Sequence, residues 1–404
     1  MEFSVQREGL LKALQSIVAI SDKRHINKPI MSHALLSTPD DTFLLLTGFD
    51  GDVEIKMRVP MVDCRNMGDA TLPARKLLDI CRNLPDQAVI KFKTEEQRMV
   101  IRSERGRFTL SMQPATDFPV LPFTTHQFEI SIKQSVLHTL ISRTFFSVAQ
   151  QDVRSFLNGL LFEMVDNTFC IVATDGHRLA LSLAPMADNN KPVIQAKRDP
   201  EKLFDADEKN IEEKTQHLLT PRHPLHLIVP RKAVVELLKL LDQPDSQITL
   251  CVANHHLRVT HEQFIFGTQL IEGRFPEYKR VIPNRSCHTV TIDRDLFKQG
   301  ILRAAVLAHE KNRGIRLQCI PGEVAVLKIL SRNPEQEGSE EEIAADYQGE
   351  GIEVGFNANY LLDVLNVLPP GAVALHFLDT RSGVLIESYD GDIKNTYVVM
   401  PLRL

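Results

Sequence analysis

The sequence predicts an α+β protein made of three similar domains, each with two helices packed on antiparallel sheets. One helical motif and one strand–helix motif each occur three times within the 404 residues. The segments between these motifs are short and alternate polar with apolar residues, which is the period of half-buried strands. Repeats have to be located before any other motif is interpreted, because they show which residues belong to the scaffold.

The helical repeat starts with a short polar stretch and continues with apolar residues at the i, i+3, i+4 and i+7 spacing of one helix face. A turn and a strand follow each helix. The three copies start at Leu72, Val229 and Phe356, and they read LPARKLLDICRNLPDQAVI, VPRKAVVELLKLLDQPDSQI and FNANYLLDVLNVLPPGAVAL. Such a chain is expected to be a symmetric scaffold rather than a protein built around one catalytic centre.

The strand–helix motif opens each repeat, at Glu2, Gln127 and His288. The interval after the second start is about 35 residues longer than the first. Residues 187–226 account for the excess, because they are rich in charge and proline and show little apolar periodicity. This composition predicts a surface excursion or a partly disordered loop. The predicted domains are residues 1–125, 126–286 and 287–404.

Each domain is expected to contain two helices separated and followed by several strands. The predicted helices cover residues 7–19, 74–84, 133–148, 231–241, 294–312 and 358–367. The predicted strands include Phe43–Leu46, Val53–Val59, Ala88–Phe92, Met99–Arg102, Gln247–Val252, Leu257–Thr260 and Val384–Glu387. Linkers are expected near Pro122–Thr125 and Pro283–Ser286, each just after a proline-rich strand end.

Composition limits the compartment and the chemistry. No apolar run is long enough to cross a membrane, and no segment reads as a signal peptide. The six cysteines form no Cys-x-x-Cys pair; they are Cys64, Cys81, Cys170, Cys251, Cys287 and Cys319. This spacing favours free thiols in a reducing cytoplasm over a zinc site or a disulfide framework.

The charge distribution suggests a polyanionic partner, although the formal net charge is −5. Five of the six predicted helices carry a net positive charge, so the remainder of the chain is acidic. Basic helices in an acidic body could hold nucleic acid on the helix side. Lysine-rich helix surfaces are also common without any such role.

The search for catalytic motifs finds one candidate. Phosphate-binding loops, dinucleotide fingerprints, zinc-protease motifs and nucleophile elbows do not occur in the sequence. Asp175 and His177 in Ala173–Ala180 could form a base and its orienting group. However, the first repeat has Asp50-Gly51 at the equivalent place, so the Asp-Gly step is predicted to be a turn between strands. No catalytic residue, metal site or cofactor is therefore predicted.

Three patches break the repeat. His177-Arg178-Leu179 follows the Asp-Gly step of the second repeat only, and residues 273–283 are richer in charged and aromatic residues than their counterpart 117–122. The third patch is the apolar end of the chain, Tyr397-Val-Val-Met-Pro-Leu-Arg-Leu404. A final strand would explain Tyr397–Val399 but not Met400–Leu404, and chain ends are usually polar.

These motifs, together with Gln151–Gly159, closely resemble the family of bacterial DNA sliding clamps, the beta subunits of the DNA polymerase III holoenzyme. The resemblance covers essentially the whole chain except 187–226. It implies a head-to-tail homodimer whose six domains form a ring around duplex DNA, with helices lining the hole. A heterologous interface can close in this way, and closure removes exposed sheet edges.

The resemblance also implies sites. The dimer interface would join a first-domain set to a third-domain set, Ile80, Leu84, Phe108 and Leu110 with Val306 and Leu307. Sequence-independent DNA contacts would come from Arg24, Gln151, Arg231 and Lys232. The family often carries an aromatic pair where this chain has Ser155-Phe156, so stacking of that pair on DNA is in doubt.

The family's partner pocket lies between the second and third domains and receives a short apolar peptide from polymerases, the clamp loader and repair proteins. Such a peptide gives the modest affinity that exchanging partners need. Carried over to this chain, the pocket comprises Leu157, Thr174, Gly176, His177, Arg178, Leu179, Pro276, Arg280, Val281, Val398, Val399, Met400, Pro401, Leu402 and Arg403.

Three functions thus remain open at this point. The leading one is a processivity factor of the bacterial cytoplasm and nucleoid, which tethers the replicative polymerase and catalyses nothing. The alternatives are a nucleic-acid-binding scaffold that does not close, and a hydrolase using Asp175 and His177.

Overall fold

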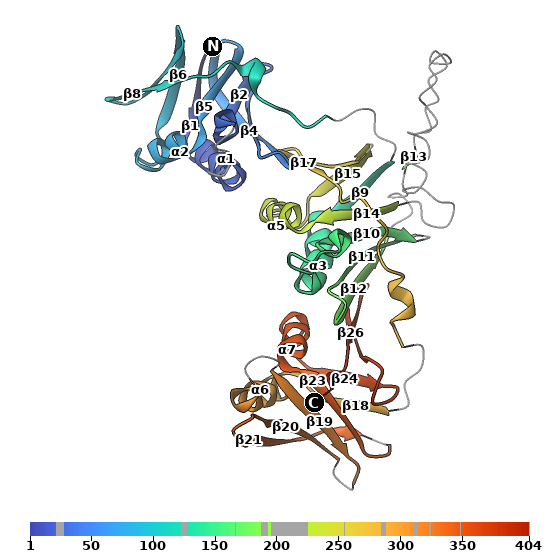
Figure 1. The fold of residues 1–404 in the computed structure, drawn as a ribbon. Coiled ribbons are helices and arrows are strands. Elements are labelled where there is room, and N and C mark those ends of the chain that lie inside the picture. The colour runs from blue at the N-terminus through green and yellow to red at the C-terminus, as the bar shows by residue number, and fades with distance from the viewer. Residues whose placement is uncertain are drawn as a thin grey trace. The chain divides into compact units, whose positions relative to one another are not determined.

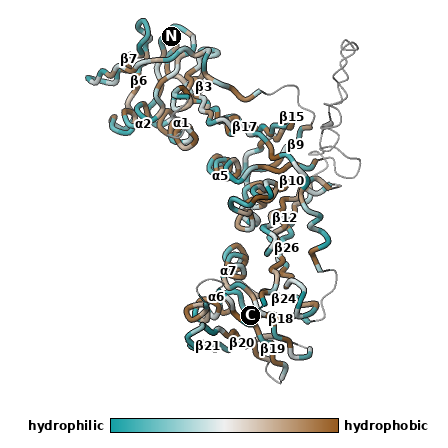
Figure 2. Tube along the Cα trace, in the orientation of Figure 1, coloured by the Kyte–Doolittle hydropathy of each residue, from teal (hydrophilic) through white to brown (hydrophobic). Residues whose placement is uncertain are grey.

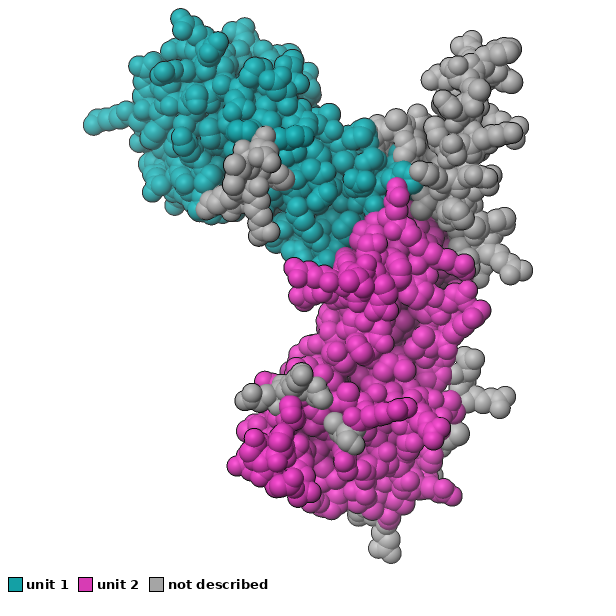
Figure 3. Space-filling view, in the orientation of Figure 1, with its two compact units in different colours: residues 1–135, 190–206, 229–270 teal, residues 136–189, 207–228, 271–404 magenta. Residues whose placement is uncertain are grey.

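The structure is a computed structural model that describes most of the chain. The described residues are 1–21, 28–122, 128–165, 167–186, 193–194, 225–253, 255–283, 288–309, 313–322, 325–347 and 349–403. The charged segment predicted at 187–226 therefore lies almost wholly outside them. The chain divides into two compact units. Unit 1 holds residues 1–135, 190–206 and 229–270, and unit 2 holds 136–189, 207–228 and 271–404 (Figure 1, Figure 3).

Unit 1 contains two copies of a helix-after-strand arrangement. Its elements are β1 (Glu2–Gln6), α1 (Arg7–Ile20), η1 (Pro29–Ser32), β2 (His33–Thr38), β3 (Phe43–Phe49), β4 (Val53–Asn66), β5 (Gly68–Pro73), α2 (Ala74–Arg82), β6 (Val89–Glu95), β7 (Arg98–Ser103), β8 (Gly106–Ser111), η2 (Ala115–Asp117), β9 (Phe128–Lys133), β13 (Val193–Ile194), α5 (Arg231–Leu240), β15 (Gln247–Ala253), β16 (His256–Thr260) and β17 (Phe264–Gln269).

Unit 2 contains the remaining described elements, and α3 begins at its boundary with unit 1. They are α3 (Gln134–Thr144), η3 (Phe145–Ser147), η4 (Ser155–Leu157), β10 (Gly159–Val165), β11 (Thr168–Thr174), β12 (Arg178–Pro185), β14 (Leu225–Pro230), η6 (Tyr278–Arg280), β18 (His288–Asp293), α6 (Arg294–Ala304), η7 (Ala305–Leu307), β19 (Gly314–Ile320), β20 (Val326–Arg332), β21 (Gly338–Ala344), β22 (Asp346–Tyr347), β23 (Ile352–Asn357), α7 (Ala358–Val367), β24 (Ala372–Phe377), β25 (Val384–Asp390) and β26 (Ile393–Val399).

The strands of each unit join the repeats edge to edge. The main path of the unit 1 sheet runs β13-β9-β15-β16-β17-β4-β1-β6-β7-β8, and β4 of the first repeat pairs with β17 of the second. We call this pairing the first junction. The large sheet of unit 2 runs β14-β10-β11-β12-β26-β25-β24-β18-β22, and its β12–β26 pairing is the second junction. A separate sheet of unit 2 runs β21-β20-β19-β23. The predicted antiparallel α+β architecture is confirmed.

The predicted helices and strands are present, but two helices are shorter than expected. The segment predicted at 133–148 is helical to Thr144, and the one at 294–312 is helical to Ala304; each then continues as one 3₁₀ turn. In the second case the Ser331 and Ser339 hydroxyls donate hydrogen bonds of 2.7 and 3.2 Å to the Ala304 carbonyl. Hydroxyls from neighbouring strands thus satisfy a carbonyl that helix periodicity cannot anticipate.

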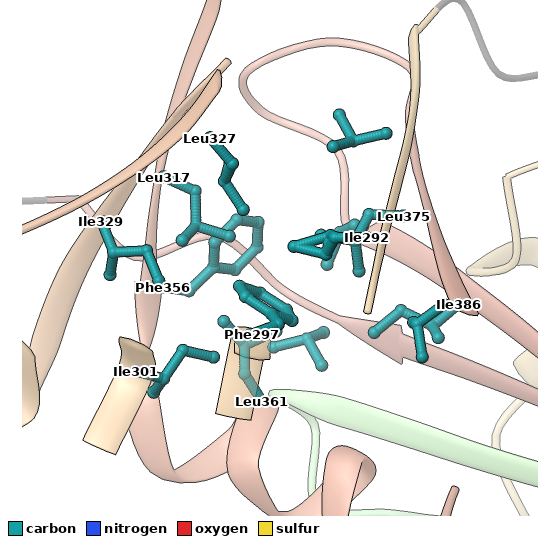
Figure 4. Packing of buried hydrophobic residues seen from close by; sticks show 14 of the residues in the cluster. Ile292, Phe297, Ile301, Leu317, Leu327, Ile329, Phe356, Leu361, Leu375 and Ile386 are labelled. Carbon is teal, nitrogen blue, oxygen red and sulfur yellow. The ribbon is translucent and has the colours of Figure 1, made fainter. Parts of the chain in front are cut away.

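Helices cover the sheets through apolar faces. In the core of unit 2, Phe297 and Ile301 of α6 meet Leu361 of α7, with Leu317 and Phe356 from the sheet (Figure 4). Helix α6 begins where the Asp293 carboxylate accepts the backbone N–H groups of Asp295 and Leu296, which is a standard N-cap. The alternating hydropathy along the strands can be followed in Figure 2. Within the described residues, no helix combines the length and apolarity needed to cross a membrane.

Candidate functional site

Several of the predicted pocket residues come together in unit 2, around the second junction. Leu179 of β12 and Val398 of β26 face each other across the strand pair and are buried. They belong to an apolar cluster that also includes Phe275 and Tyr278, with Met400 packed against it. The remaining predicted residues of segment 273–283, Pro276, Arg280 and Val281, are exposed at its rim. A buried apolar floor with an exposed rim is the form expected of a peptide site.

The Asp-Gly step is a turn, as the repeat predicted. One Asp175 carboxylate oxygen accepts the backbone N–H groups of His177 and Arg178 at 2.9 and 3.0 Å, and Gly176 has φ +88°. In unit 1, Asp50 accepts the N–H groups of Asp52 and Val53 in the same way. Both carboxylates hold a strand turn in shape.

The His177 ring does not meet the Asp175 carboxylate. It stacks on the Tyr360 ring of α7 with centroids 6.2 Å apart, and the second Asp175 oxygen accepts from Arg178 Nε at 3.0 Å. Hydrogen bonding between the base and its orienting group is what a catalytic pair requires. The arrangement therefore gives the hydrolase hypothesis no support.

Arg178 joins the turn to α7 instead of presenting a cation to solvent. Its guanidinium pairs with Asp175 and Asp363 and donates to the Phe146 carbonyl at 2.7 Å. It also lies 4.6 Å from the centroid of the Tyr360 ring. Only 11% of the side chain is exposed. Because its charge is compensated within the chain, Arg178 would shape the pocket rather than supply a charge to a partner.

The end of the chain is fixed beyond the final strand. β26 ends at Val399, and Met400 N then donates to the His177 carbonyl at 2.9 Å. Leu402 N donates to the Gly355 carbonyl at 2.8 Å. Met400, Pro401 and Leu402 are half-buried and Arg403 is exposed, while Leu404 lies outside the described residues. The tail is thus fixed by its own backbone, with Met400 against the apolar cluster.

Sequence reasoning missed Tyr360, Asp363 and Phe146, which hold His177 and Arg178 in place. A signal for Tyr360 existed. The first turns of α2 and α5 carry Arg75-Lys76 and Arg231-Lys232, whereas the first turn of α7 carries Asn359-Tyr360. The repeat is broken there as well, and the same rule that found the other patches would have found Tyr360.

The predicted DNA-contact residues differ in exposure and in whether their charge is already paired. Gln151 is exposed with φ +56°, and burial lowers the pKa of Arg231. Lys232 is ion-paired, with Nζ 2.6 Å from the buried Asp50 carboxylate and 3.7 Å from Asp52. Arg24 lies outside the described residues. Lys232 therefore gives less net charge to a polyanion than its type suggests.

The loop that precedes β10 contains Ser155 and Phe156, whose stacking on DNA the sequence left in doubt. Ser155 is exposed, but Phe156 packs against the apolar cluster of the pocket, close to Gly273. Nearby, the hydrogen bond from Arg154 lowers the pKa of Asp152 to about 2. Phe156 thus packs with the apolar cluster rather than standing free to stack on DNA.

The predicted interface residues lie on one edge strand and on helical segments. Phe108 and Leu110 are half-buried on β8, and Ile80 and Leu84 are half-buried in and after α2. In unit 2, Leu307 is half-buried and Val306 is 76% exposed on η7, which follows α6. Among the described strands, β8 and β21 end their sheets. A hollow of about 590 Å³ beside Asp293 and Asp346 involves no predicted residue.

Three repeats joined by strand pairing, with basic helices and one apolar site, define a protein of the DNA-clamp class. Family models for the N-terminal, central and C-terminal domains of the DNA polymerase III beta subunit match residues 1–122, 131–219 with 214–277, and 279–403. The chain belongs to this family, the beta sliding clamps.

Individual relatives agree over the full length. The chain is 41% identical to the beta sliding clamp of Pseudomonas putida and 40% identical to that of Escherichia coli, with 100% of each chain covered in both cases. A crystal structure of the Pseudomonas aeruginosa DNA polymerase III subunit beta superposes with a TM-score of 0.87 at 39% identity, again over 100% of both chains.

Proposed function

We propose that two copies of this chain close head to tail into a ring around duplex DNA and tether the replicative polymerase, without catalysing a reaction. The full-length family match is the observation that carries this function. The ends of the family models near residues 122 and 278 support domain boundaries near 125 and 286. A protein of this function acts in the cytoplasm, at the nucleoid.

Ring closure follows from the two junctions within the chain. At each, the fourth strand of one repeat, β4 or β12, pairs with the last strand of the next repeat, β17 or β26. The corresponding strands left over are β21 and β8. Pairing of β21 in one copy with β8 of another would repeat the junction and leave neither edge exposed.

The internal repeat also predicts the register of that pairing. Phe108, Phe266 and Tyr397 occupy equivalent positions in the three repeats. The tracing starts four residues before the first helix of each repeat, at Phe3, Ile130 and Val290. Three successive cross-strand pairs then lead to Phe108, Phe266 and Tyr397. Phe266 faces Ile55 and Tyr397 faces Ala180. Ser339 is equivalent to Ile55, because the residues that follow them, Glu340 and Lys56, lead through the same cross-strand pairs to Gly355 and Thr71, each three residues before a helix start.

Ser339 is therefore expected opposite Phe108 of the other copy, which sets Glu340 opposite Arg107. Ser339 and Phe108 are both half-buried, whereas Glu340 and Arg107 are both exposed, so each pair lies on a common face. Opposite charges facing each other across strands stabilise a pairing modestly. Val306 and Leu307 would approach Ile80 and Leu84 as the helices α6 and α2 meet.

A disulfide test separates this ring from an open scaffold. The variant with Arg107→Cys and Glu340→Cys should form, on oxidation, a covalent dimer that stays on nicked circular DNA in high salt. The matched control pairs Arg107→Cys with Glu342→Cys, two residues away on the same face, where the thiols are too far apart to bond. Equal crosslinking of both variants, or a covalent ladder of open oligomers, would contradict the register and the ring.

For the peptide pocket, we propose that the polymerase catalytic subunit, the clamp loader and repair proteins bind in turn at the second junction. The cluster with Leu179, Val398 and Met400 supplies an apolar floor, and the fixed tail supplies a pre-formed side. A pre-formed apolar site needs little ordering on binding, so a short peptide suffices. DNA contact would involve Gln151, Arg231 and Lys232 through phosphates alone.

A further inference from the structure

The rim of the peptide site on segment 273–283 is an irregular stretch with one 3₁₀ turn, η6. Phe275 and Tyr278 are buried in the apolar cluster, and Ile282 packs against it. Between them, Pro276, Arg280 and Val281 remain exposed. We call this segment the wall. The exposed residues of the wall can contact a peptide in fixed positions only if its buried residues are held in place.

The hydrogen bonds of the wall are mostly local. Tyr278 N donates to Pro276 O, Arg280 N to Glu277 O, and Val281 N to Tyr278 O. The ion pairs of Glu277 with Arg274 and Arg280 are local too. A longer-range hydrogen bond joins the wall to the sheet, from the Tyr278 hydroxyl to Glu163 Oε2 at 2.6 Å.

Glu163 is a buried carboxylate on β10, with 3% of the residue exposed. It faces Cys170 across the β10–β11 pair, and His226 Nδ1 lies 3.9 Å from its other oxygen. Burial and then the hydrogen bond to Glu163 raise the pKa of Tyr278 far above its usual value, so the phenol remains a donor. Hydrogen bonds to a buried charge are strong and costly to lose.

Unit 1 contains a counterpart built from different atoms. Phe118-Pro119 corresponds to Phe275-Pro276, so Leu121 takes the place of Tyr278. The Leu121 backbone N–H donates to Oε1 of Glu54 at 3.1 Å, and Glu54 is 1% exposed. In both units a buried glutamate of the sheet thus holds the segment that follows the last strand of a repeat.

We propose that Tyr278 is a positioning residue for partner binding. Through Glu163 it fixes the wall and thereby the places of Pro276, Arg280 and Val281 against an incoming peptide. Tyr278 itself is buried and touches no partner. This inference rests on the proposed peptide-binding function.

Tyr278→Phe tests the proposal in the full-length protein. The probe is a fluorescein-labelled synthetic peptide copying the clamp-binding segment of the polymerase catalytic subunit, with affinity measured by anisotropy. Loss of the anchor should weaken binding about 5- to 10-fold. The matched control is Tyr347→Phe, a buried tyrosine of the same unit whose hydroxyl is 2.9 Å from His288 Nδ1 and which belongs to none of the predicted sites. Its affinity should stay within twofold of the parent.

A second variant separates positioning from general stability. Tyr278→Phe combined with Glu163→Gln replaces the buried carboxylate by a neutral amide that still faces His226, so no buried charge loses its phenol donor and the melting temperature should return toward the parent value. The affinity should stay low, because the wall is still unanchored. Recovery of affinity together with stability, or unchanged affinity in Tyr278→Phe, would overturn the inference. Failure of the unmodified protein to bind the peptide would instead refute the proposed function.

Discussion

The first and second junctions use the same strand pairing but differ in what surrounds it. At the first, Leu121 and Phe118 pack with Met31 and Phe49 in a closed apolar cluster. At the second, the equivalent segment is the wall, and the tail from Met400 onward runs beside it. The same scaffold is thus filled by its own side chains in one place, and in the other it keeps an apolar floor bordered by an exposed rim. Binding is expected where the repeat is broken.

Deleting Met400–Leu404 should give the largest loss of peptide affinity and remove the difference between the two junctions. The second junction would lose one side of its site, including the segment held by Met400 N and Leu402 N. Peptide affinity should fall at least about 100-fold, as when central binding residues are removed. Anisotropy with the labelled peptide gives the affinity, and sedimentation gives the oligomeric state. A lost dimer would mean that the tail supports the ring instead.

Arg178 and Lys232 offer a comparison of the ion pairs at the two junctions. Arg178→Met leaves Asp175 and Asp363 without their shared cation, and should destabilise unit 2 by about 2–3 kcal/mol. Lys232→Met removes a half-exposed lysine from Asp50 and should cost about 1 kcal/mol. Thermal unfolding followed by circular dichroism measures both. Equal losses of unfolding free energy would show that the ion pairs of the second junction contribute no more stability than those of the first.

The two turn glycines provide a smaller, matched test. Gly51 and Gly176 have φ of +103° and +88°, so alanine should cost about 1 kcal/mol at either position. Gly51→Ala should leave peptide binding unchanged, whereas Gly176→Ala adds a methyl group near Arg154 at the predicted pocket and should weaken it. If both variants bind the peptide like the parent, Gly176 does not belong to the pocket.

Cys170 gives the smallest expected signal, since its thiol is buried beneath the site. Burial, with a contribution from Glu163, raises its pKa to about 12. A raised thiol pKa means less thiolate, roughly one molecule in ten thousand at pH 8, so alkylation of the native protein should be very slow. Half-buried Cys64 should react first among the described cysteines. Fast labelling of Cys170, read by peptide mass spectrometry, would show that the wall opens readily.

Much of the fold follows from local sequence patterns. Helix periodicity and alternating strands predict α1 and β15 because each buries one face, and the recurring Asp-Gly step predicts the turn at Asp175. The role of Arg178 could not be predicted, because its partners Asp363 and Phe146 lie far away in the sequence. The helix end at Ala304 likewise depends on hydroxyls from two strands. Tyr360 was predictable from the broken repeat but was missed.

The central claim is that the protein holds DNA by encircling it. The most direct test loads the protein on nicked circular DNA with the clamp loader and ATP, and then cuts the DNA once with a restriction enzyme. A closed ring should remain on the circle in high salt and slide off the linear molecule. Retention on linear DNA, or loss from the circle according to salt alone, would contradict the account, since surface binding depends on phosphate contacts and not on topology.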